Sequence, residues 1–416
     1  MTGAAAGPAP PPWRQRDYML LWSGMCVSTL GSNAAGIVYP LLVLALTGSP
    51  ETVGWVTALR STPFVLLALP VGAMVDRWDR RRVMLICDVA RAFVVGSLPL
   101  AFLLAEPSLL HIVVVAVVEG TLGVFYNLAE VAALPRVVPR WQLPQATAQN
   151  HAGFAAAGVA GPAFGTWLFQ IGRGLPMAFD AISYVVSAFT LWRLRGDFSA
   201  VPSTVPRDLW AEVRAGLSWL WHERLVRTMS LLTGGLNFVG AAVPLLLIVL
   251  AQQQGATASE IGLIFSLGGV GGVLGAVVGS RLQQRFSFGR VISVTVLLQA
   301  LLFPFYAVAP GPLALGLVCG LIHFIGPIYN VTQLSHRLAL IPPGLEGRVN
   351  AGFRFVAHLP NPIGAALCGL AIERLGTGWT LGGFGLTFGL LAVVAGSSRT
   401  IRHAPRVTGI DTSAKP

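Results

Sequence analysis

Charge is scarce in this chain: only 11% of its 416 residues are charged, whereas 54% are hydrophobic. A soluble globular protein carries about 25% charged residues. We therefore expect the chain to lie in a lipid bilayer. Twelve membrane spans of about 23 residues with short loops would use nearly the whole length. Too little would remain for a soluble domain of ordinary size, about 100 residues.

Lysine and cysteine are also rare. Lysine occurs once, as Lys415 in the C-terminal tail. A Walker A phosphate loop needs a lysine in a Gly-rich turn, so the chain by itself is not expected to be an ATP-driven pump. Cys26, Cys87, Cys319 and Cys368 all fall in apolar segments and lack the spacing of metal ligands. We interpret them as packing residues and predict no metal site and no cofactor.

Apolar segments of membrane-spanning length recur along the chain, and the first is too long for the core of a cleaved signal peptide. The predicted fold class is an all-α membrane protein with twelve transmembrane helices in two pseudo-symmetric six-helix bundles. The expected spans are residues 18–46, 53–75, 83–104, 109–134, 144–171, 175–195, 228–251, 258–280, 289–309, 312–335, 348–372 and 378–398. The expected domains are a cytoplasmic tail (1–17), an N-terminal bundle (18–195), a cytoplasmic linker (196–227), a C-terminal bundle (228–398) and a second tail (399–416).

The net charge of +11 is spread unevenly over this topology. With both termini inside, most of the 28 basic residues fall in the inner segments, and only Arg173 and Arg374 fall in the outer loops. Cytoplasmic loops of membrane proteins are enriched in Arg and Lys. The asymmetry therefore predicts cytoplasmic termini, and it explains the net charge without a nucleic-acid partner.

The linker at 196–227 contains a helical pattern. Its apolar side is formed by Leu209, Trp210, Val213, Leu217, Leu220 and Trp221. Its charged side is formed by Asp208, Glu212, Arg214 and Glu223. We interpret this segment as an amphipathic helix on the cytoplasmic membrane surface. A helix that only tethers the two bundles is the alternative.

A dense run of charge separates the second and third expected spans. It contains the pattern Gly-x-x-x-Asp-Arg-x-x-Arg-Arg, formed by Gly72, Asp76, Arg77, Arg80 and Arg81. This pattern resembles the signature between helices 2 and 3 of the major facilitator superfamily of transporters. The resemblance implies a gating motif, in which the aspartate interacts with the start of helix 11 on the cytoplasmic side.

Two positions of this motif carry specific expectations. Gly72 has no side chain, so another helix is expected to approach its backbone closely. Asp79 departs from the family pattern, which usually has Gly at that position.

The two halves of the chain repeat one another. The Tyr-Asn pair at 126–127 recurs at 329–330, and Gly72 ahead of the basic turn recurs as Gly275. The Gly-Pro segment at 161–165 is echoed by Asn-Pro-x-Gly at 361–364. Matches in the same order at nearly one offset indicate two related six-helix halves. Transporters built from such repeats bind substrate between the halves.

The fifth expected span is rich in small residues and contains a proline. Its motif consists of Gly158, Gly161, Pro162 and Gly165. Small residues allow close helix packing, and proline bends a helix. The motif resembles the Gly-Pro motif in helix 5 of superfamily exporters, with Thr166 in place of the usual final glycine, and this resemblance favours export over uptake.

Ionisable side chains inside a bilayer are costly and usually face a cavity or a partner. Glu119 lies near the midplane of the fourth expected span, and Tyr126 and Glu130 share its helical face. A carboxyl group in such a cavity can take up and release a proton. We therefore predict Glu119 as the proton-coupling residue, with His323 and His358 as further candidates. The alternative is a carboxyl group held by neighbouring hydroxyls and amides, without a role in turnover.

Other polar residues in the spans predict a central cavity. Asn350, Arg354, His358 and Asn361 form one polar stripe on the eleventh expected span, and such a stripe is too costly to face lipid. The predicted substrate cavity is lined by Asn33, Tyr126, Asn237, Tyr329, Asn330, Arg354 and Asn361. On the third span, Asp88 and Arg91 are expected to form a local ion pair outside this cavity.

The branch of the superfamily that this chain resembles contains bacterial efflux proteins for tetracyclines, macrolides and siderophores. The resemblance implies a proton-coupled exporter of a hydrophobic or amphipathic small molecule, working by alternating access as a monomer in the bacterial inner membrane. Its expected partners are the lipid bilayer, the small-molecule substrate and protons. An uptake symporter on the same fold remains open. A membrane enzyme or sensor would need a clustered catalytic or metal constellation, and the sequence contains none that we recognise.

Overall fold

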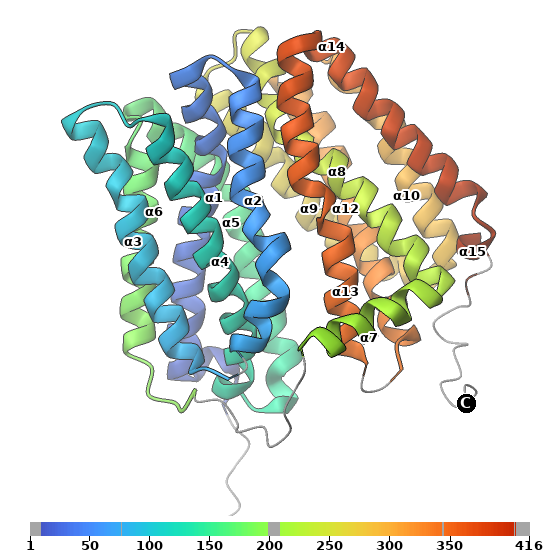
Figure 1. The fold of residues 1–416 in the computed structure, drawn as a ribbon, viewed down its shortest axis with the longest axis horizontal. Helices are drawn as coiled ribbons and strands as arrows, with labels where there is room; N and C mark the ends of the chain where they lie inside the picture. The colour runs from blue at the N-terminus through green and yellow to red at the C-terminus, as the bar shows by residue number, and fades with distance from the viewer. Residues whose placement is uncertain (1–9, 76, 199–208, 343–344, 403, 405–416) are drawn as a thin grey trace, which may run out of the picture.

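The computed structural model describes residues 10–75, 77–198, 209–342, 345–402 and 404, and these ranges contain helices and no strand. Long helices run side by side in two bundles (Figure 1). The N-terminal bundle contains α1 (Arg16–Thr47), α2 (Pro50–Val75), α3 (Arg80–Leu104), α4 (Leu109–Val137), α5 (Leu143–Ile171) and α6 (Leu175–Trp192). The C-terminal bundle contains α8 (Arg224–Gln253), α9 (Ala258–Arg285), α10 (Phe288–Leu302), α11 (Phe305–Val308), α12 (Pro312–Leu340), α13 (Glu346–His358), α14 (Pro360–Ser397) and α15 (Arg399–Arg402). Helix α7 (Leu209–His222) lies between them in sequence, at the same end of the molecule as the start of α1 (Figure 1).

Local sequence explains where several helices begin. Asp79 is the N-cap of α3, where its carboxylate accepts a hydrogen bond of 2.9 Å from the backbone N–H of Arg82. Ser108 caps α4 in the same way, and Thr257 with Glu260 forms a capping box at the start of α9. Such caps satisfy backbone N–H groups that have no partner within the helix. The aspartate that departs from the family pattern therefore has a local structural role.

Among the described residues, eleven helical segments are long and apolar enough to cross a membrane. The last of them, Gly347–Ser397, has 51 residues and combines most of α13 with α14. Gly376 within α14 has a φ angle of 84°, a left-handed conformation that favours glycine, and the chain reverses there (Figure 1). A straight helix of this length would exceed twice the thickness of a hydrocarbon core of about 30 Å. The all-α membrane fold is confirmed, whereas twelve crossings stay a prediction.

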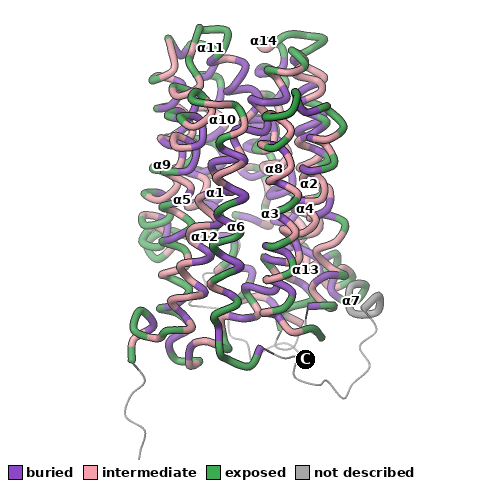
Figure 2. Tube along the Cα trace, turned by 90° about the vertical axis from the view of Figure 1, so that its left-hand side faces the viewer, coloured by how far each residue is buried: buried purple, intermediate pink, exposed green. Residues whose placement is uncertain are grey.

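Exposed positions continue over the whole height of the bundles (Figure 2). Many of them are large apolar side chains, such as Phe93, Leu103 and Trp379, with 77%, 83% and 80% of their surface exposed. A soluble monomer rarely exposes such extended apolar surface. These side chains therefore identify the lipid-facing surface of the protein.

The two bundles meet mainly at the end of the molecule away from α7. A Cβ atom on Gly54 of α2 would lie 2.9 Å from the Cα atom of Gly369 of α14. On the other side, Ser266 of α9 accepts a hydrogen bond of 3.2 Å from the backbone N–H of Ala163 of α5. Toward the end that carries α7, here named the α7 end, the ribbons of the two bundles diverge (Figure 1).

Helix α7 packs part of its apolar side against the C-terminal bundle. Gly216 packs directly on the carbonyl group of Arg348 in α13, and Leu217 lies against Gly352 of the same helix. Leu220 is fully buried in the core of the C-terminal bundle, whereas Trp221 is 50% exposed. The expected position of α7 on the membrane surface stays a prediction.

Candidate functional site

A polar cavity of about 410 Å³ is cut into the wall of the N-terminal bundle. Its lining comes from all six helices of that bundle. The polar lining residues are Ser28, Thr29, Ser32, Thr57, Arg60, Ser61, Arg91, Glu119, Tyr126, Asn127, Glu130 and Tyr184. A cavity with convergent polar groups inside a membrane protein is the expected form of a transport site.

An ion pair between Arg60 of α2 and Glu119 of α4 forms part of the cavity wall. The Nη2 and Nε atoms of Arg60 lie 3.0 and 3.2 Å from the Oε1 and Oε2 atoms of Glu119, which is a bidentate arrangement. The Glu119 side chain is only 6% exposed, against 28% for Arg60. The Tyr184 hydroxyl donates a third hydrogen bond to Glu119, at 3.4 Å. Charge-assisted bidentate pairs are the strongest class of such contacts, so this pair fixes both side chains in the cavity wall.

The backbone around this ion pair is closely packed. A Cβ atom on Gly120 would overlap the carbonyl group of Arg60. Only glycine therefore allows α2 and α4 to approach closely enough for the side chains at 60 and 119 to meet. The guanidinium group of Arg60 also lies 4.7 Å above the ring of Tyr39, which adds a cation–π contact.

Arg91 of α3 forms a second charged cluster beside the first. Its Nη2 atom lies 3.8 Å from the Oδ1 atom of Asp88, so the predicted ion pair is confirmed. Its guanidinium group lies between the rings of Tyr126 and Tyr184, at 4.5 and 4.7 Å. The expected position outside the cavity was wrong, because Arg91 reaches past Asp88 and lines the cavity.

Phe64 of α2 connects this cavity with the C-terminal bundle. The ring of His358 packs edge-on against Phe64 at 5.3 Å, and the guanidinium group of Arg354 lies 5.5 Å from the same ring. Asn361 lies 3.5 Å from the His358 ring nitrogen. The predicted polar stripe of the eleventh span therefore comes next to the cavity, as expected for residues that face the bundle interior.

Other predicted cavity residues do not line this cavity and bond within or between helices. Asn33 donates to the Thr29 carbonyl at 2.8 Å, and Asn237 donates to the Ala357 carbonyl at the same distance. The Tyr329 hydroxyl lies 2.7 Å from the Thr233 hydroxyl, and Asn330 is exposed. Asn33, Asn237 and Tyr329 therefore have hydrogen-bond partners within the helices.

Among the predicted proton carriers, the histidines and Glu119 are placed differently. His323 is exposed, and its Nδ1 atom lies 2.9 Å from the carbonyl oxygen of Cys319. It does not line the cavity, whereas Glu119 does. His358 approaches the cavity only through Phe64.

The expected close approach at Gly72 is not found. Among the described residues, no atom lies within 4 Å of a Cβ atom built on Gly72. The physical reason is that the bundles diverge at the α7 end, where α2 ends. Arg77 is exposed there, and Asp76 lies outside the described residues.

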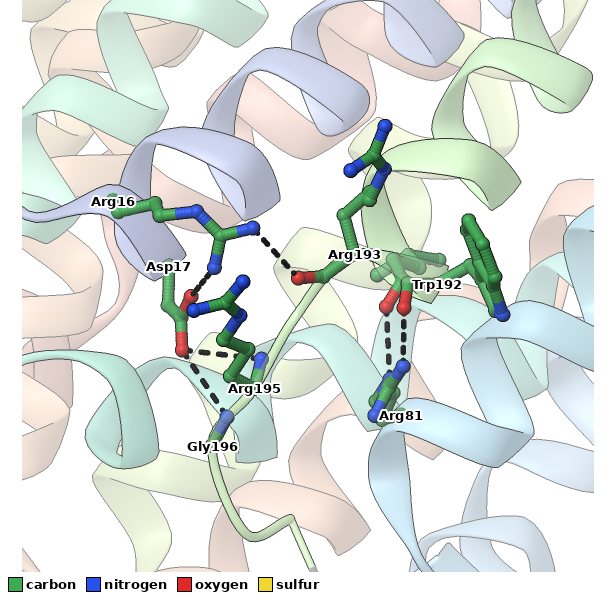
Figure 3. Close-up of polar contacts among 8 residues, drawn as sticks. Arg16, Asp17, Arg81, Trp192, Arg193, Arg195 and Gly196 are labelled. Atoms are coloured by element: carbon green, nitrogen blue, oxygen red, sulfur yellow. Dashed lines mark hydrogen bonds and ion pairs between the residues drawn. The ribbon is translucent and has the colours of Figure 1, made fainter.

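The arginines of the motif contact the chain segment that follows α6. Arg81 donates from Nε to the Leu191 carbonyl at 2.9 Å and from Nη2 to the Trp192 carbonyl (Figure 3). The backbone N–H of Arg80 donates to the Phe198 carbonyl at 3.2 Å. A positive charge at a helix C-terminus stabilises the unpaired carbonyl groups there. Arg80 and Arg81 therefore link the start of α3 to the end of α6 and to the segment that follows it.

Asp17 at the start of α1 also binds the segment that follows α6 (Figure 3). Its Oδ2 atom accepts hydrogen bonds from the backbone N–H groups of Arg195 and Gly196, at 3.3 and 3.1 Å. Its Oδ1 atom lies 3.2 Å from Arg16, which also donates to the Arg193 carbonyl. The exit of the chain from the N-terminal bundle is thus held by side chains of α1 and α3.

The Gly-Pro motif of α5 provides close contacts on two sides. Cβ atoms on Gly161 and Gly165 would overlap Asn33 and Ala34 of α1. A Cβ atom on Gly269 of α9 would lie 2.7 Å from the carbonyl oxygen of Gly158. Pro162 is buried in the same interface. The motif therefore packs α5 against α1 within the bundle and against α9 of the other bundle.

Arg60 is the residue of the candidate site that sequence reasoning missed. It stands among the charges inside the spans, but nothing in the local sequence links α2 to α4. A usable signal was that Arg60 and Glu119 both lie near the middle of their helices. Among the described residues, no group of three His, Cys, Asp or Glu side chains could hold a metal ion.

Comparison with known proteins places this site in a transporter. Residues 21–365 match the sequence model of the Major Facilitator Superfamily. The multidrug efflux pump Tap of Mycolicibacterium fortuitum is 27% identical over 423 residues, covering 97% of this chain and 99% of that protein. The enterobactin exporter EntS of Salmonella typhimurium is 27% identical over 392 residues, covering 92% of this chain and 93% of that protein.

Solved structures agree on the fold. The nucleoside transporter NupG superposes with a TM-score of 0.72 at 13% identity, covering 90% of this chain and 98% of NupG. A bacterial homologue of the lysosomal transporter Spinster, in an inward-facing and unoccupied conformation, gives a TM-score of 0.70 at 13% identity, covering 96% of this chain and 98% of that one. The chain is therefore a membrane transporter rather than an enzyme, and it belongs to the Major Facilitator Superfamily.

Proposed function

We propose that this protein is a proton-coupled exporter of hydrophobic or amphipathic small molecules. The observation that carries the proposal is the buried Arg60–Glu119 ion pair in the wall of a polar cavity. Similarity to efflux pumps over nearly the whole chain supports export rather than uptake. The site is built within one chain, which supports a monomer as the transporting unit.

The coupling step would be the protonation of Glu119. In the ionised state, Arg60 and Tyr184 hold the carboxylate. A proton on Oε1 or Oε2 removes the charge that attracts Arg60, so the guanidinium group is released toward the cavity. Because α2 carries Arg60 and also packs against α14 of the other bundle, a change at this pair can alter the contact between the halves. Alternating access requires such a link between proton binding and bundle movement.

The gate would act at the α7 end. The bundles diverge there, and Gly72 is free of close contacts in this conformation. In the opposite conformation, Gly72, Asp76 and Arg77 would approach the start of α13. The divergence at this end supports an arrangement in which the present state receives substrate from the α7 side.

The proposal is tested by replacing Glu119 with glutamine, which keeps the shape and removes the titrating group. A drug and metabolite susceptibility screen of an overexpressing strain, with and without a protonophore, would first identify a transported compound. In proteoliposomes, Glu119→Gln should abolish accumulation of that compound against a gradient and preserve its binding. Glu106→Gln is the matched control, because Glu106 is 70% exposed in a loop. Normal gradient-driven transport by Glu119→Gln would assign coupling to another group.

We also propose that both termini and α7 lie in the cytoplasm, on the basis of the arginine distribution. Reporter fusions after Gly48 and after Glu106 should report the outer side of the membrane. A cytoplasmic signal at either position would contradict this orientation.

A further inference from the structure

The charges that line the cavity balance each other. Arg60 and Arg91 are the two cations of the lining, and Glu119 and Glu130 are the two anions. Asp88 is completely buried behind the wall. A ligand that enters this part of the site therefore meets no large excess of either charge from the N-terminal bundle.

The facing C-terminal bundle has a different charge balance. In residues 224–398 the acids are Glu260, Glu346 and Glu373. Glu260 and Glu346 lie at the starts of α9 and α13, and Glu373 lies just before the break at Gly376 in α14. Arg354 of α13 is exposed, and among the described residues no carboxylate lies within ion-pair distance of it. Its guanidinium group lies 5.5 Å from the ring of Phe64. Arg354 therefore adds a positive charge that no carboxylate of the described residues neutralises.

A second arginine adds to the positive charge near Arg354. Arg337 of α12 is only 5% exposed and lies 3.7 Å above the ring of Phe353, the residue before Arg354. Its Nε atom has no hydrogen-bond partner among the described residues. Charged side chains in a membrane normally pair with one another or mark a ligand pathway. Among the described residues neither arginine has a carboxylate partner, and Arg354 lies against Phe64, which lines the polar cavity. This arrangement indicates that an anion completes the site.

We propose that the transported molecule carries an anionic group with oxygen acceptors, bound by Arg354, on an aromatic or other flat apolar skeleton that lies against Phe64. This inference rests on the proposed exporter function and defines the substrate class of that site. A guanidinium group matches carboxylate, sulfonate and phosphate oxygens in a bidentate geometry. Phe64 is shared by Arg354, His358 and the cavity, so it places the apolar part of the ligand at the junction of the two bundles.

The test uses two probes with one skeleton: anilinonaphthalene sulfonate, which is anionic, and its uncharged parent phenylnaphthylamine. Binding is measured by fluorescence titration of the full-length protein in nanodiscs of zwitterionic lipid, with empty nanodiscs as background. The wild-type protein should bind the sulfonate about 10-fold more tightly or better, because a hydrogen-bonded charge pair is worth at least that factor. Arg354→Gln should remove this preference, and Arg354→Lys should retain most of it.

The control is Arg374→Gln, which removes an exposed arginine at the opposite end of the bundle and should leave the preference unchanged. Equal binding of both probes, no binding of either probe, or an unchanged preference in Arg354→Gln would overturn the proposal. Gradient-driven transport of cationic or neutral compounds alone would reject the anionic class and leave the exporter function intact. Absence of gradient-driven transport for every compound would instead reject the exporter function.

Discussion

The two bundles handle charge inside the membrane differently. In the N-terminal bundle, Arg60 pairs with Glu119 and Arg91 pairs with Asp88. In the C-terminal bundle, Arg354 lies against an aromatic ring of the other bundle, and no described carboxylate pairs with it. A bundle that neutralises its own charges depends on those pairs for stability. In a bundle where a charge such as that of Arg354 has no partner, the charge can bind the transported molecule.

The largest expected effect comes from breaking the ion pair on one side only. Arg60→Gln would leave the nearly buried Glu119 carboxylate without its partner, and we expect a loss of about 3 kcal/mol in the free energy of unfolding. The double variant Arg60→Gln/Glu119→Gln leaves no buried charge without a partner and should recover most of this loss. Unfolding of the purified protein in mixed detergent micelles measures both.

Two controls sharpen this comparison of the bundles. Arg354→Gln in the C-terminal bundle removes the partner of no described carboxylate. It should therefore change the free energy of unfolding by no more than about 0.5 kcal/mol. Arg173→Gln breaks the exposed pair with Glu106, which is worth about 0–1 kcal/mol. Equal destabilisation by Arg60→Gln and Arg354→Gln would remove the distinction between the bundles.

An intermediate effect is expected where the repeat places a glycine in both bundles. A Cβ atom on Gly165 would overlap the backbone of Ala34, and one on Gly364 would overlap the carbonyl group of Phe238. Either glycine-to-alanine substitution should therefore cost about 1–3 kcal/mol, because the helices must move apart. The melting temperature in detergent checks this.

Matched glycines with open surroundings serve as controls. No described atom lies within 4 Å of a Cβ atom on Gly158 or Gly389. Alanine at these positions should be neutral or stabilise the helix by up to about 1 kcal/mol. If Gly158→Ala and Gly165→Ala behaved alike, the contacts of α5 would not depend on the particular glycine.

The smallest effect is expected at the C-terminus of the last helix in each bundle. Arg81 binds the carbonyl groups at the end of α6, and Arg402 donates to the Gly396 carbonyl near the end of α14, at 2.6 Å. Arg81→Gln should cost about 1 kcal/mol, because carbonyl groups lose a charged donor. The neighbouring exposed Arg82 is the control, and Arg82→Gln should change stability by less than about 0.5 kcal/mol. A larger cost for Arg82→Gln would contradict the role given to Arg81.

Regular features of the sequence predicted much of the fold. In the N-terminal bundle the expected spans begin and end within a few residues of the helices, because an apolar run of bilayer length has few alternatives to a helix. The last two expected spans do not coincide with α13 and α14, because hydropathy alone does not locate the break between these helices. The contact of α7 with α13 was not predicted either, because the apolar side of an amphipathic helix can be buried by lipid or by protein.

The sequence by itself determined that this chain crosses a membrane repeatedly, that it belongs to one superfamily, and that Glu119 lies at mid-depth on α4. These properties depend on composition, on short motifs and on position along a single helix. Only the tertiary structure decided that Glu119 pairs with Arg60, that Arg91 reaches the cavity and that Gly72 has no close neighbour among the described residues. Each of these depends on which helices are adjacent and at which end the bundles diverge, and contacts between residues far apart in sequence leave no local pattern from which to read them.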